Sequence, residues 1–166
     1  MKRAIFCDRD GVINDNTKHV NKPDDLTIYN EAKEGLKKLY NNEYELFVVT
    51  NQGGVELGYI GETQLDGIHE KMIKELKDYC EFKEIVYCPD FHRKSDCRKP
   101  KPGMIVKLAK KYDIDLKNSW MIGDMETDIT AGIKAGCKTG KIGKKDERAD
   151  VNGRNLNDLA DKILEQ

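Results

Sequence analysis

Two aspartates stand two positions apart in the segment FCDRDGVIN, where a short apolar run ends. Asp8 and Asp10 carry like charges, which repel each other unless a cation or a bound group shares them. Such a pair is either a surface turn or a site in which one carboxylate attacks and the other moves a proton. The polar residues that follow the other apolar runs of the chain decide between these two interpretations.

Chemically useful side chains follow three further apolar runs, ELFVV, EIVYC and SWMIG. The carboxyl ends of parallel strands meet at one edge of a sheet, and ligands of such folds bind there. We therefore expect these side chains to share one crevice with the two aspartates. They are Thr50 and Asn51 after the second run, Arg98 and Lys99 after the third, and Asp124 and Asp128 after the fourth.

Apolar runs and stretches of helical spacing alternate along the chain. Strands are expected at residues 4–7, 45–50, 84–88, 119–124 and 138–143. Helices are expected at residues 31–40, 63–79, 104–112, 128–135 and 156–164. This alternation predicts an α/β fold, a doubly wound and mainly parallel sheet sandwiched by helices, with residues 1–166 as a single domain. His69, in the second helix, is expected to be a partly exposed surface residue.

The composition argues against several classes of partner. The 166 residues carry a formal net charge of -1, which offers no electrostatic basis for binding nucleic acid or an acidic membrane surface. No signal peptide or membrane-spanning run is recognisable, so we expect a cytoplasmic protein, and we expect it to be a monomer. The five cysteines are scattered and odd in number, which is typical of thiols in a reducing compartment.

Three acids, a threonine and a lysine form a set with a definite chemical use. Asp8, Asp10 and Asp124 repel one another unless a cation lies among them, and Mg²⁺ is the usual choice for such oxygen ligands. Binding a phosphoryl group between a metal ion and an ammonium group is how proteins stabilise its transfer. The groups that can hold the phosphate oxygens are the Thr50 hydroxyl, the backbone N–H groups around Asn51 and Gly53, and the Lys99 ammonium.

Four segments of the chain resemble, in order and in spacing, the four motifs of the haloacid dehalogenase (HAD) superfamily. They are FCDRDGVIN, VVTNQGG, RKPKPGM and MIGDMETDI, and the match runs from Asp8 to Asp128. The resemblance implies that Asp8 is the nucleophile and forms an aspartyl-phosphate. It implies that Asp10 protonates the leaving group and then activates the water that hydrolyses this intermediate.

The same resemblance assigns the other motif residues. Thr50 and Lys99 would stabilise the phosphoryl group. Asp124 would hold Mg²⁺ together with Asp8 and the backbone carbonyl of Asp10. Asp128 would orient the water shell of the metal.

A narrower group within this superfamily shares DRDG, TNQ-G and C-R-K-P-x-P-G-M with the chain. It contains the D-glycero-D-manno-heptose 1,7-bisphosphate phosphatases and the histidinol-phosphate phosphatases, which lack a large cap domain. The chain has no long insertion between its motifs, so we expect no such cap here. The resemblance implies a phosphoric monoester hydrolase acting on a small phosphorylated sugar, with removal of the 7-phosphate of heptose bisphosphate. Histidinol phosphate or another small monoester is the alternative substrate.

A signalling receiver domain is a competing interpretation from another class. It also has a doubly wound sheet with an acidic pocket, a threonine and a lysine. In a receiver the phosphorylated aspartate follows the third strand, whereas here that strand leads into the loop that starts at Cys88. The order of the motifs therefore disfavours a receiver.

Loops decide which substrate such an enzyme takes. Arg98 matches an arginine that helps recognise substrate in the heptose enzymes, and its guanidinium can hold a second phosphate through two hydrogen bonds. Met125 stands where those enzymes often have a lysine, and His19 stands where they have a tyrosine, so the substrate stays open. The residues that we expect around the substrate are Arg9, His19, Asn51, Gln52, Gly53 and Arg98.

The segment CPDFHRKSDCRKP resembles a zinc loop of the pattern C-x-H…C-x-C that is common in the family. Cys88 and Cys97 match its outer cysteines, while Asp90 and Ser95 replace its histidine and its inner cysteine. His92 lies close enough to substitute, which would make Cys88, His92 and Cys97 the Zn²⁺ ligands. Whether zinc binds stays open, with the loss of thiolates slightly favouring a loop without metal.

Overall fold

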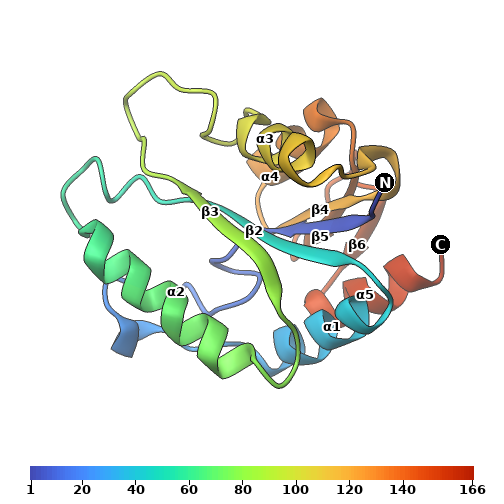
Figure 1. Cartoon of the computed structure of the whole chain (residues 1–166), viewed down its shortest axis with the longest axis horizontal. Helices are drawn as coiled ribbons and strands as arrows, with labels where there is room; N and C mark the ends of the chain where they lie inside the picture. The colour runs from blue at the N-terminus through green and yellow to red at the C-terminus, as the bar shows by residue number, and fades with distance from the viewer.

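A single six-stranded parallel sheet forms the centre of the molecule (Figure 1). The computed structural model describes all 166 residues. The strands lie in the order β3-β2-β1-β4-β5-β6. Their bounds are Ala4–Cys7 (β1), Glu45–Asn51 (β2), Phe82–Cys88 (β3), Trp120–Gly123 (β4), Lys138–Ile142 (β5) and Val151–Gly153 (β6). The helices are Asn30–Asn41 (α1), Glu62–Leu76 (α2), Gly103–Tyr112 (α3), Glu126–Ala135 (α4) and Leu156–Leu164 (α5).

Helices cover both faces of this sheet, α1, α2 and α5 on one face and α3 and α4 on the other (Figure 1). Successive side chains of a strand point to opposite faces, and both faces must therefore be apolar. In β1, Ile5 and Cys7 join the core beneath α1, α2 and α5, while Ala4 and Phe6 join the core beneath α3 and α4. The continuous apolar runs of the sequence follow from this double burial.

The winding of the chain reverses at β1. Starting from β1, the chain adds β2 and β3 on one side and then returns to add β4, β5 and β6 on the other side. The adjacent crossovers therefore leave a crevice beyond the carboxyl ends of β1 and β4. Asp8 follows β1 directly and Asp124 follows β4 directly, so both carboxylates lie at this crevice.

The predicted α/β architecture is confirmed, and its errors are local. The sixth strand, β6, was not predicted, because VNG is short and contains a glycine in place of an apolar run. The second helix ends at Leu76 and not at Tyr79, since the backbone N–H groups of Tyr79 and Cys80 both donate to the Leu76 carbonyl in a closing turn. Neither difference moves a residue of the site.

The expected lack of a large cap domain is also confirmed. Between β1 and α1 the chain forms one short 3₁₀ helix, Pro23–Asp25, and between β2 and α2 it forms only a loop. The crevice is therefore walled by loops of the core fold. No helix combines the length and apolar character that crossing a membrane requires.

Candidate active site

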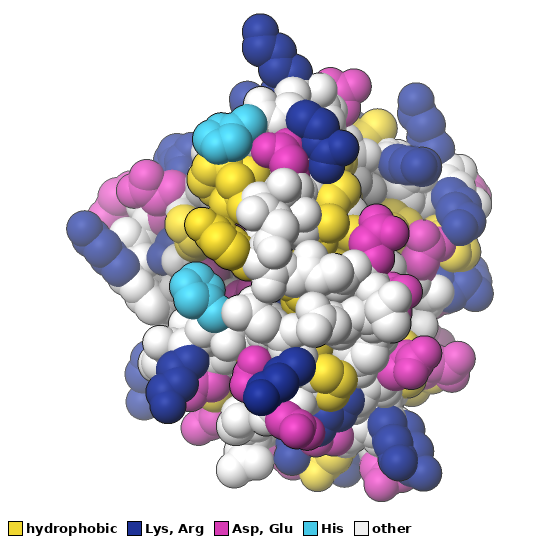
Figure 2. Space-filling model, turned by 90° about the vertical axis from the view of Figure 1, so that its left-hand side faces the viewer, with side chains coloured by type: hydrophobic (Ala, Val, Ile, Leu, Met, Phe, Trp, Pro, Cys, Tyr) yellow, Lys and Arg dark blue, Asp and Glu magenta, His cyan; other side chains and the backbone are white.

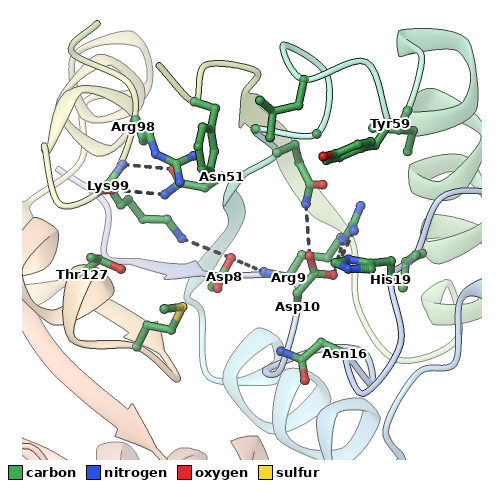
Figure 3. Close-up of a pocket in the computed structure, with 18 of the residues that line it drawn as sticks. Asp8, Arg9, Asp10, Asn16, His19, Asn51, Tyr59, Arg98, Lys99 and Thr127 are labelled. Atoms are coloured by element: carbon green, nitrogen blue, oxygen red, sulfur yellow. Dashed lines mark hydrogen bonds and ion pairs between the residues drawn. The ribbon is translucent and has the colours of Figure 1, made fainter. Parts of the chain in front are cut away.

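A cavity of about 750 Å³ opens at the carboxyl ends of the strands (Figure 3). Loops that follow β1, β2, β3 and β4 all contribute to its wall, as the strand order requires. The residues predicted from the sequence that line it are Asp8, Arg9, Asp10, His19, Asn51, Gln52, Gly53, Arg98, Lys99, Asp124 and Asp128. Thr50 lies directly behind this wall, buried at the end of β2.

Lys99 lies at the centre of the charged groups, with only 4% of its surface exposed. Its Nζ is 3.1 Å from Asp8 Oδ1 and 2.7 Å from Asp128 Oδ1, and it donates to the Val49 carbonyl at 2.9 Å. Burial disfavours the ammonium form, but the two carboxylates together outweigh burial and raise the pKa of Lys99. The site therefore holds a permanent positive charge beside Asp8.

Asp8 and Asp124 have carboxylates that the protein alone leaves poorly neutralised. Burial, with help from Asp128 and Asp10 and against the effect of Lys99, raises the pKa of Asp8 to about 6. Burial and the nearby Asp8 likewise raise the pKa of Asp124 to about 6. Asp124 Oδ1 is buried and has no hydrogen-bond partner. A cation between these groups would supply what both carboxylates lack.

The oxygen atoms present fit a Mg²⁺ ion. Carboxylate oxygens of Asp8, Asp124 and Asp128 lie within 4.8 Å of one another, and Mg²⁺ prefers such hard ligands. Asp128 uses Oδ1 for Lys99 and Oδ2 for the backbone N–H of Met125, so it is occupied by protein groups. Asp8 and Asp124 therefore remain as the carboxylates with free oxygens, and Asp128 lies behind them.

Asp10 has two carboxylate oxygens in unequal surroundings. Oδ1 accepts from Arg9 Nε at 3.0 Å, from Arg9 Nη2 at 2.9 Å and from Asn14 Nδ2 at 3.0 Å. Oδ2 accepts only from Gln52 Nε2, at 3.3 Å. Three donors hold Oδ1 as an acceptor, so a proton on this carboxyl group belongs on Oδ2.

The Arg9 side chain is buried, with 1% of its surface exposed. It was predicted to contact substrate, and it does line the cavity, but its guanidinium is already engaged by Asp10 and by His69. Arg9 Nη1 lies 3.1 Å from His69 Nε2. Because arginine can only donate, His69 Nε2 accepts, and the ring proton of the neutral imidazole is on Nδ1.

The expectation that His69 is partly exposed is wrong. Only 7% of its surface is exposed, because α2 packs over the loop that follows β1. Burial and the Arg9 charge lower the pKa of His69 to about 4, which keeps the ring neutral at pH 7. No signal near His69 in the sequence reveals this contact. Asn14, which was also missed, lies inside the first motif segment and four residues after Asp10.

Asn51 and Gln52 organise the wall that β2 provides. The Asn51 side chain accepts from the backbone N–H of Lys99 at 3.0 Å and donates to the Lys99 carbonyl at 3.2 Å. Gln52 Nε2 donates to Thr50 Oγ1 at 2.9 Å and also reaches Asp10. Asn51 thus fixes the backbone of the lysine, and Gln52 connects the threonine with the second aspartate.

An apolar and partly aromatic rim surrounds the mouth of the cavity. Figure 2 shows this end of the molecule, where apolar side chains lie between two histidines. The exposed apolar side chains of the rim are Leu57, Tyr59, Phe91 and Met125. Arg98 stacks on Phe91, with its guanidinium carbon 4.9 Å from the ring centre, and donates Nη1 to the Asp90 carbonyl at 2.9 Å. In Figure 3, His19 lies on the opposite side of the cavity from Arg98.

The structure brings two of the three expected zinc ligands together, Cys88 and Cys97, but not His92. Cys88 and Cys97 are joined in a disulfide, which leaves neither sulfur as a thiolate. Asp90 is the residue whose ligand atom lies within 4.8 Å of both sulfurs, and His92 is not part of this group. The backbone N–H of His92 instead donates to Glu56 in the neighbouring loop.

Sequence comparisons identify the family to which the chain is similar. A family profile of haloacid dehalogenase-like hydrolases matches residues 8–142. A D-glycero-alpha-D-manno-heptose-1,7-bisphosphate 7-phosphatase of Photorhabdus laumondii is 36% identical over 143 residues, 81% of this chain and 78% of its own. A D-glycero-beta-D-manno-heptose-1,7-bisphosphate 7-phosphatase of Haemophilus ducreyi is 35% identical over 167 residues, 95% of this chain and 92% of its own.

Solved structures share the same fold. The D,D-heptose 1,7-bisphosphate phosphatase of B. bronchiseptica, solved with magnesium and phosphate, superposes with a TM-score of 0.90. It is 28% identical, and the match covers 98% of each chain. The chain described here belongs to the haloacid dehalogenase-like hydrolases. It is an enzyme of the phosphoric monoester hydrolase type.

Proposed function

We propose that the protein is a Mg²⁺-dependent phosphatase that removes the 7-phosphate of D-glycero-D-manno-heptose 1,7-bisphosphate through an aspartyl-phosphate on Asp8. The observation that carries the reaction type is the position of Lys99, 3.1 Å from Asp8 and 2.7 Å from Asp128 at the edge of an acidic crevice. The names of the curated relatives support the substrate.

Asp8 would act as the nucleophile. Its Oδ1 is held by the backbone N–H of Arg9 at 2.8 Å and by Lys99, so the carboxylate is fixed before substrate arrives. Bound by Asp8, Asp124 and the Asp10 carbonyl, Mg²⁺ would supply electrostatic stabilisation of the phosphoryl oxygens. Lys99 and Thr50 would stabilise the same charge from the protein side.

Asp10 would move the proton in both half-reactions. When the Asp8 carboxylate attacks phosphorus, the bond from phosphorus to the sugar oxygen breaks, and that oxygen receives the proton from Asp10 Oδ2. In the second half-reaction Asp10 Oδ2 takes a proton from water, whose oxygen attacks phosphorus and releases Asp8. Arg9 and Asn14 would keep Oδ1 out of this exchange by holding it as an acceptor.

The shape of the cavity supports a phosphorylated metabolite with a second recognition point. Its volume of about 750 Å³ exceeds what one phosphate fills, and Arg98 lies on its wall. Arg98 would pair with a second phosphate, which favours a bisphosphate. The aromatic rim of Tyr59 and Phe91 supports histidinol phosphate as a second candidate, because an imidazole ring packs well against such side chains.

Steady-state kinetics on both heptose 1,7-bisphosphate anomers, histidinol phosphate and glycerol 2-phosphate tests these assignments. We expect the highest kcat/KM on a heptose bisphosphate, dependent on Mg²⁺ and abolished by EDTA. Equal or higher kcat/KM on histidinol phosphate would contradict the proposed substrate. Asp8→Asn should lower kcat by ~10³-fold or more, since removal of a covalent nucleophile costs this much in comparable enzymes. An Asp8→Asn variant with most of its activity would disprove the aspartyl-phosphate.

A further inference from the structure

A single carboxylate joins the two loops that form the outer wall of the cavity. Glu56, in the loop after β2, accepts from three successive backbone N–H groups in the loop after β3. They belong to Phe91 at 3.2 Å, His92 at 2.8 Å and Arg93 at 2.9 Å. Three convergent N–H donors form a nest that selects an anion, and here a side chain of the protein fills it.

Further contacts show that this connection is a built feature. The Glu56 backbone N–H donates to the Pro89 carbonyl at 3.1 Å, and Arg93 Nε reaches Glu56 Oε1 at 2.9 Å. The backbone donors lower the pKa of Glu56 to about 2, so the carboxylate stays ionised throughout the working range of an enzyme. Hydrogen bonds to a charged acceptor are the stronger kind, about twice a neutral one.

The segment held by Glu56 carries one face of the cavity. Phe91 supports the Arg98 guanidinium, and the Asp90 carbonyl holds Arg98 Nη1. Both side chains rest on Gly53 at the start of the opposite loop, where an added Cβ would lie 2.8 Å from the Phe91 ring and 3.1 Å from Arg98 Nη1. The position of Arg98 over the cavity therefore depends on how the two loops are fixed to each other.

The disulfide and Glu56 restrain different parts of the second loop. Cys88 and Cys97 are nine positions apart, and their disulfide joins the two ends of the loop. By itself the disulfide does not contact the residues in the middle of the loop. Glu56 holds the middle of that loop, at residues 91–93, which the disulfide does not reach.

We propose that Glu56 is a positioning residue for substrate selection, because it holds Phe91 and Arg98 against the part of the substrate beyond the reacting phosphate. The inference rests on the proposed phosphatase function and adds a residue outside the catalytic group. Glu56 does not touch the reacting atoms. Its loss should therefore weaken the binding of large substrates and leave the chemistry on a small ester intact.

Kinetics on Glu56→Ala and Glu56→Gln test this role. On heptose 1,7-bisphosphate we expect KM to rise about tenfold in Glu56→Ala, with a smaller rise in Glu56→Gln, because losing a charge-assisted group of contacts is worth about this factor. On glycerol 2-phosphate we expect kcat/KM to stay within about twofold of the original enzyme. Arg93→Met is the matched control, since it removes the ion pairs of the exposed Arg93 side chain with Glu56 and Asp90 but keeps all three N–H contacts. It should behave like the original enzyme.

A double-mutant cycle with Arg98→Lys separates positioning from a general loss of structure. If Glu56 acts through Arg98, the two substitutions together should raise KM for the bisphosphate little more than Arg98→Lys alone. If the increases in KM caused by the two single substitutions multiply in the double variant, the inference is contradicted. So would an unchanged ratio of kcat/KM between bisphosphate and glycerol 2-phosphate in both Glu56 variants.

Hydrogen exchange on the free protein provides a second readout that needs no substrate. Amides of residues 91–93 should exchange at least tenfold faster in Glu56→Ala, while those of β1 and β2 keep their protection. Unchanged exchange at residues 91–93 would overturn the inference. If the original enzyme does not prefer the bisphosphate, the proposed substrate fails, and the exchange experiment still decides whether Glu56 holds the loop.

Discussion

Arg9 and His69 form a buried pair in which Arg9 Nη1 lies 3.1 Å from His69 Nε2. The same guanidinium holds Asp10 Oδ1 through Nε and Nη2. A helix on the outside of the sheet, α2, is thereby connected to the carboxylate proposed as general acid and base. The arrangement needs a neutral imidazole, because a protonated ring would place two cations in contact without solvent.

This pair makes stability depend on pH in a predictable direction. Folded His69 binds its proton only near pH 4, whereas an unfolded histidine does so near pH 6.5. Between these values the unfolded chain binds more protons, so acid favours unfolding, by about 2 kcal/mol from this residue between pH 7 and pH 5. The His69→Gln variant lacks this titrating group. Between pH 7 and pH 5 its free energy of unfolding should therefore decrease by about 2 kcal/mol less than that of the original protein.

Urea unfolding at pH 7 and pH 5 measures that difference. His92→Gln is a suitable control, because His92 is exposed and its ring packs against Phe91, whereas the Arg9 side chain contacts Asp10 and His69. It should leave the pH dependence of the original protein unchanged. Identical pH dependence in the His69→Gln variant would show that the imidazole is not held neutral by Arg9.

Asn51 should matter for turnover through the lysine that it holds. Removing its amide in Asn51→Ala leaves the Lys99 backbone N–H and carbonyl without their partners. The ammonium is then less well placed for charge that develops during phosphoryl transfer, so kcat should fall roughly 10- to 100-fold, with a smaller change in KM. Asn42→Ala removes an exposed side chain that donates to Lys38 in α1, and it should keep full activity. A larger effect on KM than on kcat would point to substrate contact instead.

Gly11 should be necessary for metal binding. It has φ +80°, and a Cβ added there would collide with Asp124 Oδ2. Gly11→Ala should therefore displace Asp124 and weaken Mg²⁺ binding at least tenfold in calorimetric titration. Gly58 also has φ +80° but has nothing within 4 Å of an added Cβ, so Gly58→Ala imposes similar backbone strain without the collision. Equal Mg²⁺ affinity in the two variants would contradict the collision.

Gly35 allows α1 to approach α5 closely. An added Cβ would lie 2.6 Å from the Leu156 carbonyl oxygen, which belongs to rigid backbone. Gly35→Ala should lower the free energy of unfolding by about 1–3 kcal/mol, despite the better helix propensity of alanine. In Gly67→Ala, in α2, the added Cβ meets only side-chain atoms of Pro23, the nearer at 3.2 Å, and the substitution should be neutral or stabilising. Denaturant unfolding of both variants checks this opposite behaviour.

Much of the fold could be predicted because its signals are local. The run AIFC coincides with β1, and the polar residues after β1, β2 and β4 meet because parallel strands end at one edge. The strand β6 could not be predicted, since it depends on pairing with β5 and has little apolar character of its own. The local sequence pattern predicts a strand only where burial requires apolar residues. It does not predict a strand that forms mainly by pairing with its neighbour.

The residues of the candidate site that follow strands could be predicted, and those that act through distant contacts could not. Asp8, Lys99 and Asp124 were predicted from their positions after strands, and their catalytic roles stay predictions. His69 and Glu56 reach the site through the packing of α2 and through contact between two loops. Nothing beside either residue in the sequence marks it, because the partner is far away along the chain. The disulfide between Cys88 and Cys97 likewise depends on loop geometry that residue spacing alone does not determine.

The absence of a cap changes what limits turnover. In enzymes that close over their substrate, opening of a lid is often the slow step, and such large motions are damped by a viscous solvent. Here the crevice is walled by loops joined through Glu56 and the Asn51–Lys99 contacts, so no domain has to swing before product leaves. Turnover should then follow the chemistry at Asp8 and Asp10. Glycerol or sucrose added to the assay should leave kcat nearly constant as the viscosity of the solution rises.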